Sequence, residues 1–316
     1  MSEHSATENL SGENPVGSPR PRVAAFSFSR ILTIAGGTIT QLVRMKTFYF
    51  LLAFAVLATV LTEILTFPDT PVRQLSQVKK GVFGAMDLFA WLYTITATAL
   101  LIPKDIEDRT LYTILCKPVR RIEYLFGKLI GVLTIVAISL VIMFTICSAI
   151  IFAQESTFIA AEVEAMQADS SYSQREVERQ VALIQEQGVR PELAVAALAS
   201  FLKAAVVAGM TLFLSTFASS SLFTIIVAVL LFLIGHAHTL ATGYWLAESG
   251  RNIVVQQLVK VFKIIIPDFQ IFAFSEGIVL GEAVSMPLVG NMCLLTLAYL
   301  VVFLLLSLLV FVDKEF

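Results

Sequence analysis

The sequence has little charge for its length. Charged residues make up 15% of 316 residues and hydrophobic residues 57%, whereas charged residues form about a quarter of an ordinary soluble domain. This composition excludes a soluble globular chain and indicates an integral membrane protein. The net charge of -2 provides no basic face that would neutralise phosphates, so nucleic acid is not an expected partner.

Cysteine and histidine are also scarce. Cys116, Cys147 and Cys293 show no CxxC spacing, which excludes a disulfide framework or a zinc site built on them. His236 and His238 stand two positions apart, so on one helix their side chains diverge by about 200° and cannot chelate a single ion. No metal site is expected.

Motifs for bound cofactors and for catalysis are missing as well. The only Gly-Lys pair near a phosphate-loop pattern, Gly127-Lys128, is followed by Leu129, and Ile122 stands where the first glycine belongs. There is no HExxH motif and no Ser/His/Asp grouping. We therefore predict no catalytic residues and no cofactor on this chain, and we predict that it is not itself an enzyme.

What the sequence does contain is long apolar runs. A run of roughly 20 apolar residues is long enough to cross a bilayer as a helix, and the chain has six. The predicted fold is therefore an all-α, polytopic membrane domain over residues 26–316 with both termini on one side of the membrane. The expected spans are about 48–67, 82–102, 126–153, 193–216, 221–246 and 287–312.

Basic residues indicate the orientation. They are more frequent near the N-terminus, in the segment 103–126 and at the C-terminus than on the opposite side. Because basic residues favour the cytoplasmic side, we expect both termini in the cytoplasm and the protein in the cell's inner (plasma) membrane. Residues 1–25 are polar and aperiodic, which predicts a disordered cytoplasmic tail.

An amphipathic helix is predicted over residues 27–46. Its apolar positions recur every three to four residues, with arginines between and beside them, and this pattern is typical of a helix lying in the lipid headgroup layer. The alternative is a helix packed against protein. The apolar positions are Phe28, Ile31, Leu32, Ala35, Ile39, Leu42 and Val43.

The segments expected on the outer side differ in length. Residues 68–81 are predicted to form a short loop. Residues 154–192 are rich in Glu, Gln and Ala, which predicts one or two outer helices broken near Gly188 and Pro191. Residues 247–286 hold a second amphipathic stretch, expected to be an outer-leaflet or re-entrant helix.

Three charged residues fall within predicted spans, namely Glu63, Asp87 and Lys203. A charge in the membrane costs about 2.5–3.5 kcal/mol on insertion scales. A pair between Lys203 and Asp87 or Glu63 would remove most of that cost. The cluster is expected either to hold helices together or to line a substrate path.

The segment 103–126 carries more charge than a simple connecting loop needs. It also has a helical apolar stripe at Ile106, Leu111, Ile114 and Leu115. We interpret it as a docking element. Behind it, Gly127 and Gly131 have a small-xxx-small spacing that permits close approach of a second helix.

This segment, together with the six spans and the N-terminal amphipathic helix, resembles the ABC-2 type transporter permeases, and most of all their multi-copper enzyme maturation (NosY-like) branch. Many members of the wider family have Gly before the Thr-Leu pair, where this chain has Arg109, as in that branch. The matching residues are Glu107, Thr110-Leu111, Ile114-Leu115, Lys117-Pro118, Arg120-Arg121, Tyr124 and Gly127-Lys128.

The resemblance implies a permease subunit of an exporter that dimerises, as a homodimer or heterodimer, in the lipid membrane. Each copy would bind a separate ABC ATPase subunit, which would carry the ATP and Mg. Arg120 and Arg121 would hold the coupling segment near the headgroups. The coupling residues implied are Asp105, Glu107, Asp108, Arg109, Thr110, Leu111, Lys117 and Pro118, and the first four of these would contact the ATPase.

An ATP-independent transporter or a membrane scaffold is the alternative. Secondary carriers place ionisable groups near the midplane and usually show internal repeats with broken helices. Here only Lys203 approaches the midplane, and the sequence shows no convincing repeat. The substrate is not specified by any motif.

Overall fold

The computed structural model describes residues 26–46, 48–49, 52–53, 55–57, 60, 70–107, 119–168, 173–218, 220–237, 267–272, 277 and 285–313. Within these residues all regular structure is helical. Residues 1–25, predicted to be a disordered tail, lie outside the described residues, as do most of the predicted first span and most of the segment 247–286.

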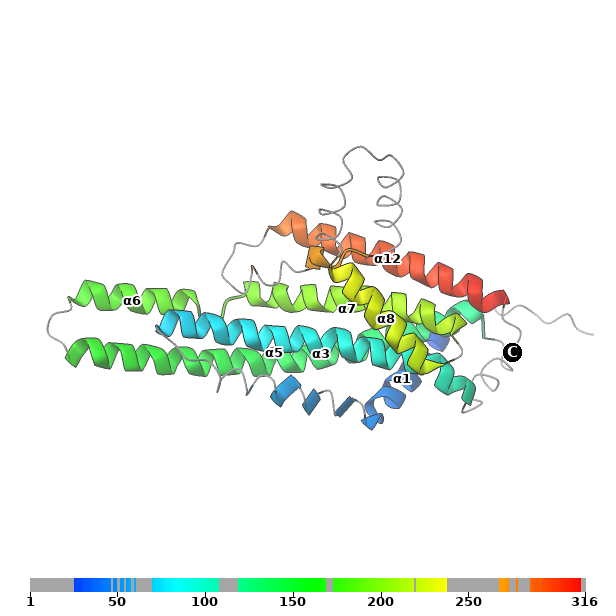
Figure 1. Cartoon of the computed structure of the whole chain (residues 1–316), viewed down its shortest axis with the longest axis horizontal. Helices are drawn as coiled ribbons and strands as arrows, with labels where there is room; N and C mark the ends of the chain where they lie inside the picture. The colour runs from blue at the N-terminus through cyan, green and yellow to red at the C-terminus, as the bar shows by residue number, and fades with distance from the viewer. Residues whose placement is uncertain are drawn as a thin grey trace, which may run out of the picture.

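Four long helices form the body of the molecule (Figure 1). They are α3 (Pro71–Glu107), α5 (Arg121–Ala168), α7 (Glu192–Phe217) and α12 (Met286–Asp313). The helix α8 (Ser221–His236) crosses α7 obliquely. At one end of the long axis α6 (Gln174–Glu186) lies beside α5, and towards the other end α1 (Phe28–Val43) lies near the beginning of α5 and the end of α12.

Among the described residues, four helical segments are long and apolar enough to cross a membrane. They are Val72–Ile106, Arg121–Ala168, Glu192–Phe217 and Met286–Phe311. The helix α8 is also apolar, but its 16 residues fall short of the roughly 20 that a crossing needs. The described part of the structure is therefore all-helical, with several helices suited to a membrane, as the composition predicts. The presence of six spans stays a prediction.

The helix α3 begins earlier than the sequence suggested. Residues 71–81, predicted to form a loop, are helical. Pro71 occupies the first helical position, where its missing N–H is not needed, and Leu75, Val78 and Val82 point into the core with at most 2% exposure. Polar residues such as those of 71–81 mark where the hydrocarbon layer ends, but they do not end a helix.

The helix α5 is a single helix of 48 residues. At 1.5 Å per residue it spans about 72 Å, more than twice the roughly 30 Å of a bilayer's hydrocarbon core. Residues 154–168, expected to belong to a separate outer segment, continue this helix. The helix α6 runs back beside it (Figure 1), and the turn that contains Gly188 and Pro191 leads to α7.

The start of α6 is fixed by a local polar contact. The backbone N–H of Ser173 donates to Glu176 Oε2 at 2.8 Å, and the Ser173 hydroxyl donates to the same oxygen at 2.9 Å. These bonds favour the ionised carboxylate and lower the pKa of Glu176. The contact therefore stabilises α6 above that pKa and is lost as the pH falls through it.

The helix α7 lies at the centre of the bundle and α12 at its edge. In its most apolar window 72% of α7 is buried, compared with 22% of α12. Trp91 of α3 stacks on Phe232 of α8 with ring centroids 4.4 Å apart. Phe232 also lies 5.1 Å from Phe269 of the short 3-10 helix η1 (Phe269–Phe272), so η1 is held against α8.

The helix α1 packs directly on α5 through the two glycines noted in the sequence. A Cβ atom added to Gly127 would lie 2.8 Å from Ile34 Cβ, and one added to Gly131 would lie 2.6 Å from Thr38 Cβ. On the α1 side, Ile31, Ala35, Thr38 and Leu42 are buried. The small-xxx-small spacing therefore admits α1. Phe28 and Leu32, two members of the predicted apolar stripe, are more than half exposed.

We predict that Gly131→Ala weakens the docking of α1. The new methyl group would overlap the Thr38 side chain and Ala35 O, and overpacking of this kind costs about 1–3 kcal/mol. Limited proteolysis of the purified protein should show faster cleavage within residues 28–43 and a lower thermal midpoint.

Gly84→Ala and Gly290→Ala are matched controls, because a Cβ at either glycine meets nothing within 4 Å. In a helix alanine is favoured over glycine by up to about 1 kcal/mol, so these variants should be as stable as the wild type or more so. Equal stability of Gly131→Ala and Gly84→Ala would contradict the tight α1–α5 contact.

Candidate functional site

A buried polar cluster lies where α1 meets the end of α3 and the beginning of α5. Its centre is Asp105, in the last turn of α3 and 4% exposed. Asp105 Oδ2 accepts a hydrogen bond from Tyr124 Oη at 2.6 Å and pairs with Lys128 Nζ at 2.6 Å. Gln41 of α1 completes the contact: its Nε2 donates to Asp105 Oδ1 at 3.3 Å, and its Oε1 accepts from Lys128 Nζ at 3.1 Å.

The spacing along α5 produces this arrangement. Tyr124 and Lys128 are four residues apart and therefore share one face of the helix. Lys128 Nζ also lies 5.7 Å from the centroid of the Tyr124 ring, within the range of a cation–π contact. The cluster thus pairs a buried cation with a buried anion, which is the condition under which burial of either charge is tolerated.

A second carboxylate, Glu123, holds two helix starts together. It is fully buried, and its Oε2 accepts from the backbone N–H of Arg120, the residue before α5, at 3.1 Å. Its Oε1 accepts from the backbone N–H of Ser27, the N-cap of α1, at 2.8 Å. Arg30 of α1 neutralises the carboxylate through a 3.0 Å contact to Oε2. One side chain therefore fixes the beginnings of both α1 and α5.

The end of α12 joins the same region through Arg121. The Arg121 guanidinium donates to the backbone oxygen of Phe311 at 2.6 Å, and a cation near the last carbonyls of a helix is favourably placed. The Phe311 ring lies 5.9 Å from the Arg121 guanidinium carbon and 5.9 Å from the Tyr124 ring. Four helices thus meet at one end of the molecule.

Beside the cluster, α1, the end of α3 and the beginning of α5 line an open pocket of about 580 Å³. Arg44 and Lys104 line it together with Asp105, Lys128 and Gln41. Because Asp105 is neutralised by Lys128, the lining is basic as a whole.

The arrangement fixes both ends of the charged segment predicted to dock. The helix α3 ends at Glu107 and α5 begins at Arg121, so Asp105 lies near the beginning of the segment 103–126 and Glu123 near its end. Each is bonded to α1, and Asp105 is bonded to α5 as well. The two ends of the segment are therefore joined to α1, α3 and α5 through buried, charge-assisted contacts.

The predicted coupling residues divide into three groups. Asp105 is buried and bonded to Tyr124, Lys128 and Gln41. Arg120 is exposed, and Arg121 is partly buried against α12. The others, apart from Glu107 at the end of α3, lie outside the described residues, namely Asp108, Arg109, Thr110, Leu111, Lys117 and Pro118.

Several residues of the cluster were not predicted as site residues, among them Gln41, Glu123, Tyr124 and Lys128. A signal for Glu123 is present in the sequence, since an acidic residue three positions after a helix N-cap often bonds back to the cap. The i, i+4 spacing of Tyr124 and Lys128 placed them on one face. No sequence pattern connected them to Gln41, which lies 87 positions from Lys128 along the chain.

Two of the three charged residues predicted to lie within spans, Asp87 and Lys203, form an ion pair in the structure. Lys203 Nζ of α7 lies 2.7 Å from Asp87 Oδ2 of α3. The Lys203 side chain is 5% exposed and the Asp87 side chain 25% exposed. This ion pair connects two adjacent helices about midway along α3, whereas Glu63 lies outside the described residues.

Comparison with known proteins gave no assignment: no family model matches the chain, and no curated protein matches it. Within the described part of the chain, no group of three or more His, Cys, Asp or Glu residues is arranged to hold a metal ion.

We predict that Asp105→Asn destabilises the fold by about 3–5 kcal/mol, because the Lys128 ammonium would be left buried without its counter-charge. Adding Lys128→Met should restore much of the loss. Thermal denaturation of the purified variants measures both effects. Glu178→Gln, which neutralises an exposed acid on α6, is the control and should leave the midpoint unchanged. A stable Asp105→Asn single variant would contradict the role given to the pair.

For the ion pair between Lys203 and Asp87, we predict that Lys203→Met lowers the free energy of unfolding by about 2–3 kcal/mol. This is somewhat less than for a fully buried pair, because Asp87 is partly exposed. The double variant with Asp87→Leu should recover wild-type stability, as measured by the thermal midpoint. If the double variant is stable but inactive in transport, the pair lines a substrate path; if it is stable and active, the pair only joins helices.

Proposed function

We propose that this chain is the transmembrane permease subunit of an ABC exporter of the ABC-2 type. In this proposal a separate ATPase subunit hydrolyses ATP, and the permease couples that hydrolysis to the movement of a substrate across or out of the membrane. Two permease subunits assemble in the lipid bilayer of the plasma membrane. The chain itself binds no nucleotide.

The observation that carries the proposal is the anchoring of the charged segment at both ends. A coupling element has to move with the helices that it drives, since a loosely attached loop would absorb the displacement. Asp105 and Glu123 are each buried and bonded across helix boundaries. These contacts give the segment between Glu107 and Val119 the stiff attachment that force transmission requires.

The helix α1 has a place in the same proposal. One face is buried on α5, and the side chains of Phe26, Phe28 and Leu32 remain 52–62% exposed. Exposed aromatic and aliphatic side chains on a helix with basic residues are suited to the headgroup layer. We therefore place α1 in the cytoplasmic headgroup layer, where it would brace the coupling segment from the side.

The location of the helix ends supports both termini on one side of the membrane. The N-cap of α1, Ser27, is bonded to Glu123, and Phe311 near the end of α12 is bonded to Arg121. Both described ends of the chain thus lie at the end of the molecule that carries the charged segment (Figure 1). We assign this end to the cytoplasm, where an ATPase would be available.

The proposal predicts that reversing two charges in the segment, Glu107→Arg with Arg109→Glu, abolishes coupling. The chain should be co-expressed with an ABC ATPase encoded beside its gene, then purified and tested for complex formation and ATPase rate. We expect the wild type to retain the ATPase, and we expect the reversal to lower ATPase retention by at least tenfold, because like charges across an interface cost several kcal/mol.

A matched control is Arg175→Glu with Glu178→Arg on α6, which reverses one exposed base and one exposed acid at the far end of the molecule. This variant should bind the ATPase like the wild type. If no ATPase is retained by the wild type, or if both reversals behave alike, the coupling function is wrong. An ATP-independent transporter or scaffold then becomes the better assignment.

A further inference from the structure

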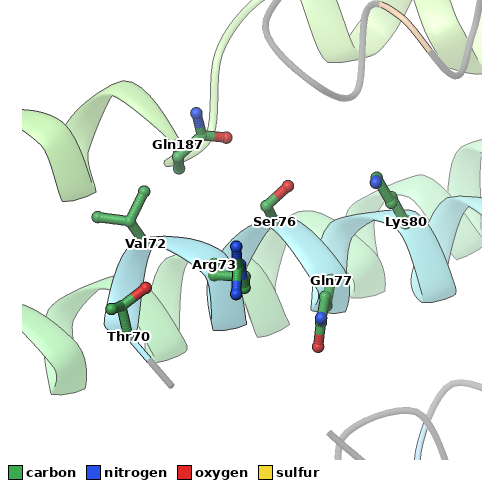
Figure 2. Close-up of a pocket in the computed structure, with 7 residues that line it drawn as sticks. All are labelled: Thr70, Val72, Arg73, Ser76, Gln77, Lys80 and Gln187. Carbon is green, nitrogen blue, oxygen red and sulfur yellow. The ribbon is translucent and has the colours of Figure 1, made fainter. Parts of the chain in front are cut away.

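A second polar pocket lies at the opposite end of α3, far from the buried cluster. It has a volume of about 500 Å³ and is formed by the first turns of α3 and the turn between α6 and α7. Figure 2 shows Gln187 of that turn facing α3, with Ser76 and Lys80 pointing to the side of α3 on which Gln187 lies. The lining residues are Thr70, Val72, Arg73, Ser76, Gln77, Lys80 and Gln187.

The chemistry of this lining selects an anion. Arg73 and Lys80 are both exposed, lie seven residues apart and therefore occupy one face of α3, about 10 Å apart along its axis. Side chains of that length can converge on a group between them. Of the described residues that line the pocket, none is acidic, and the Ser76 hydroxyl adds a further hydrogen-bond donor.

A neighbouring contact removes an acceptor from this environment. Lys79, which is 2% exposed, donates from Nζ to Gln187 Oε1 at 3.0 Å. The Gln187 carbonyl oxygen is thereby bonded to an ammonium group. Glu155 of α5 contacts Gly188, so its carboxylate lies against the turn and is not part of the described lining.

The depth of the pocket points to a lipid. Lys80 lies 24 residues from Lys104 along the same helix, or about 36 Å, whereas the hydrocarbon core is about 30 Å thick. With Lys104 in one headgroup layer, Lys80 reaches the other. Arg73 lies about 10 Å beyond Lys80, or about 46 Å from Lys104 along the helix axis. A helix tilt of about 20° shortens that distance along the membrane normal to roughly the 40–45 Å that include both headgroup layers.

The residues that follow Lys80 on the same face of α3 offer an exposed surface that an acyl chain could contact. The same helical stripe continues with Gly84 and Leu88, both exposed. A Cβ added to Gly84 would meet nothing within 4 Å, so the surface there is open and smooth. The basic pocket is thus followed along α3 by the exposed Gly84 and Leu88, with Asp87, which is partly exposed and paired with Lys203, beside them.

We propose that this pocket binds the phosphate of an anionic phospholipid in the leaflet opposite the charged segment. Arg73 and Lys80 hold the phosphate, Ser76 donates a hydrogen bond to it, and one acyl chain runs along Gly84 and Leu88. The site is independent of nucleotide-driven coupling, because it lies at the other end of α3 from Asp105 and shares no residue with that cluster.

Lipid titration followed by native mass spectrometry tests the proposal on the full chain after delipidation in detergent. Phosphatidylglycerol and phosphatidylcholine are the probes, with inorganic phosphate as a soluble competitor. We expect one phosphatidylglycerol to bind more tightly than phosphatidylcholine. Arg73→Gln with Lys80→Gln should weaken phosphatidylglycerol binding by about tenfold or more, since each basic residue near an anionic lipid contributes on the order of 1 kcal/mol.

Two control variants make the result specific. Arg175→Gln with Arg179→Gln removes two exposed bases from α6 and should leave phosphatidylglycerol binding within twofold of the wild type. Arg73→Lys with Lys80→Arg keeps the charges and should also bind. Unchanged binding after loss of Arg73 and Lys80, or equal binding of the two lipids by the wild type, overturns the site. Complete displacement of the lipid by millimolar inorganic phosphate overturns its assignment to a lipid.

Discussion

The structure depends on the neutralisation of buried carboxylates where helices meet. Away from water, an ionised carboxylate is tolerated only when cations and hydrogen-bond donors surround it. Asp105 and Glu123 satisfy this requirement with groups from different helices: Lys128 and Tyr124 of α5 and Gln41 of α1 for the first, and Arg30 and two backbone N–H groups for the second. Because separating either carboxylate from its partners would cost several kcal/mol of stability, these contacts fix the relative positions of α1, α3 and α5.

Polar contacts at the two ends and within the bundle have different roles. At one end the buried cluster joins helices rigidly and surrounds the attachment points of a charged segment. Midway, Lys203 and Asp87 connect α3 to α7. At the far end Lys79 and Gln187 bring the turn after α6 onto α3, next to a pocket that remains accessible. The same helix α3 contributes to all three contacts.

Composition and periodicity predicted the class of fold, and they located most of the long helices, because apolar runs of membrane length have few structural alternatives. They failed at the helix ends. Residues 71–81 were predicted to be a loop, yet they are helical, and apolar positions such as Leu75 and Val78 are buried there. Residues 154–168 were predicted to belong to a separate outer helix, yet they continue α5 without a break. Hydropathy reports the solvent around a segment, whereas packing decides where the helix stops.

The candidate site was predictable only in its local parts. The charged segment and the glycine spacing stood out in the sequence, and the structure accounts for Gly127 and Gly131 by the close approach of α1. The partners of Asp105 and Glu123 come from distant segments, and a single sequence carries no signal that pairs Gln41 with Lys128 or Ser27 with Glu123. The resemblance to ABC-2 permeases drew attention to Asp105, but not to its burial among groups from α1 and α5.

The docking of α1 also sets an order of events during synthesis. Ser27 and Glu123 are separated by 96 positions, and the glycine surface that receives α1 follows a few residues after Glu123. At translation rates of about 5–20 residues per second, α1 emerges roughly 5–20 seconds before its binding surface exists. During that interval the apolar face of α1 needs another surface that shields it from water, which the membrane or a chaperone would supply. The helix α1 is therefore synthesised before the surface that receives it, and it reaches its final position only after residues 123–131 have been made.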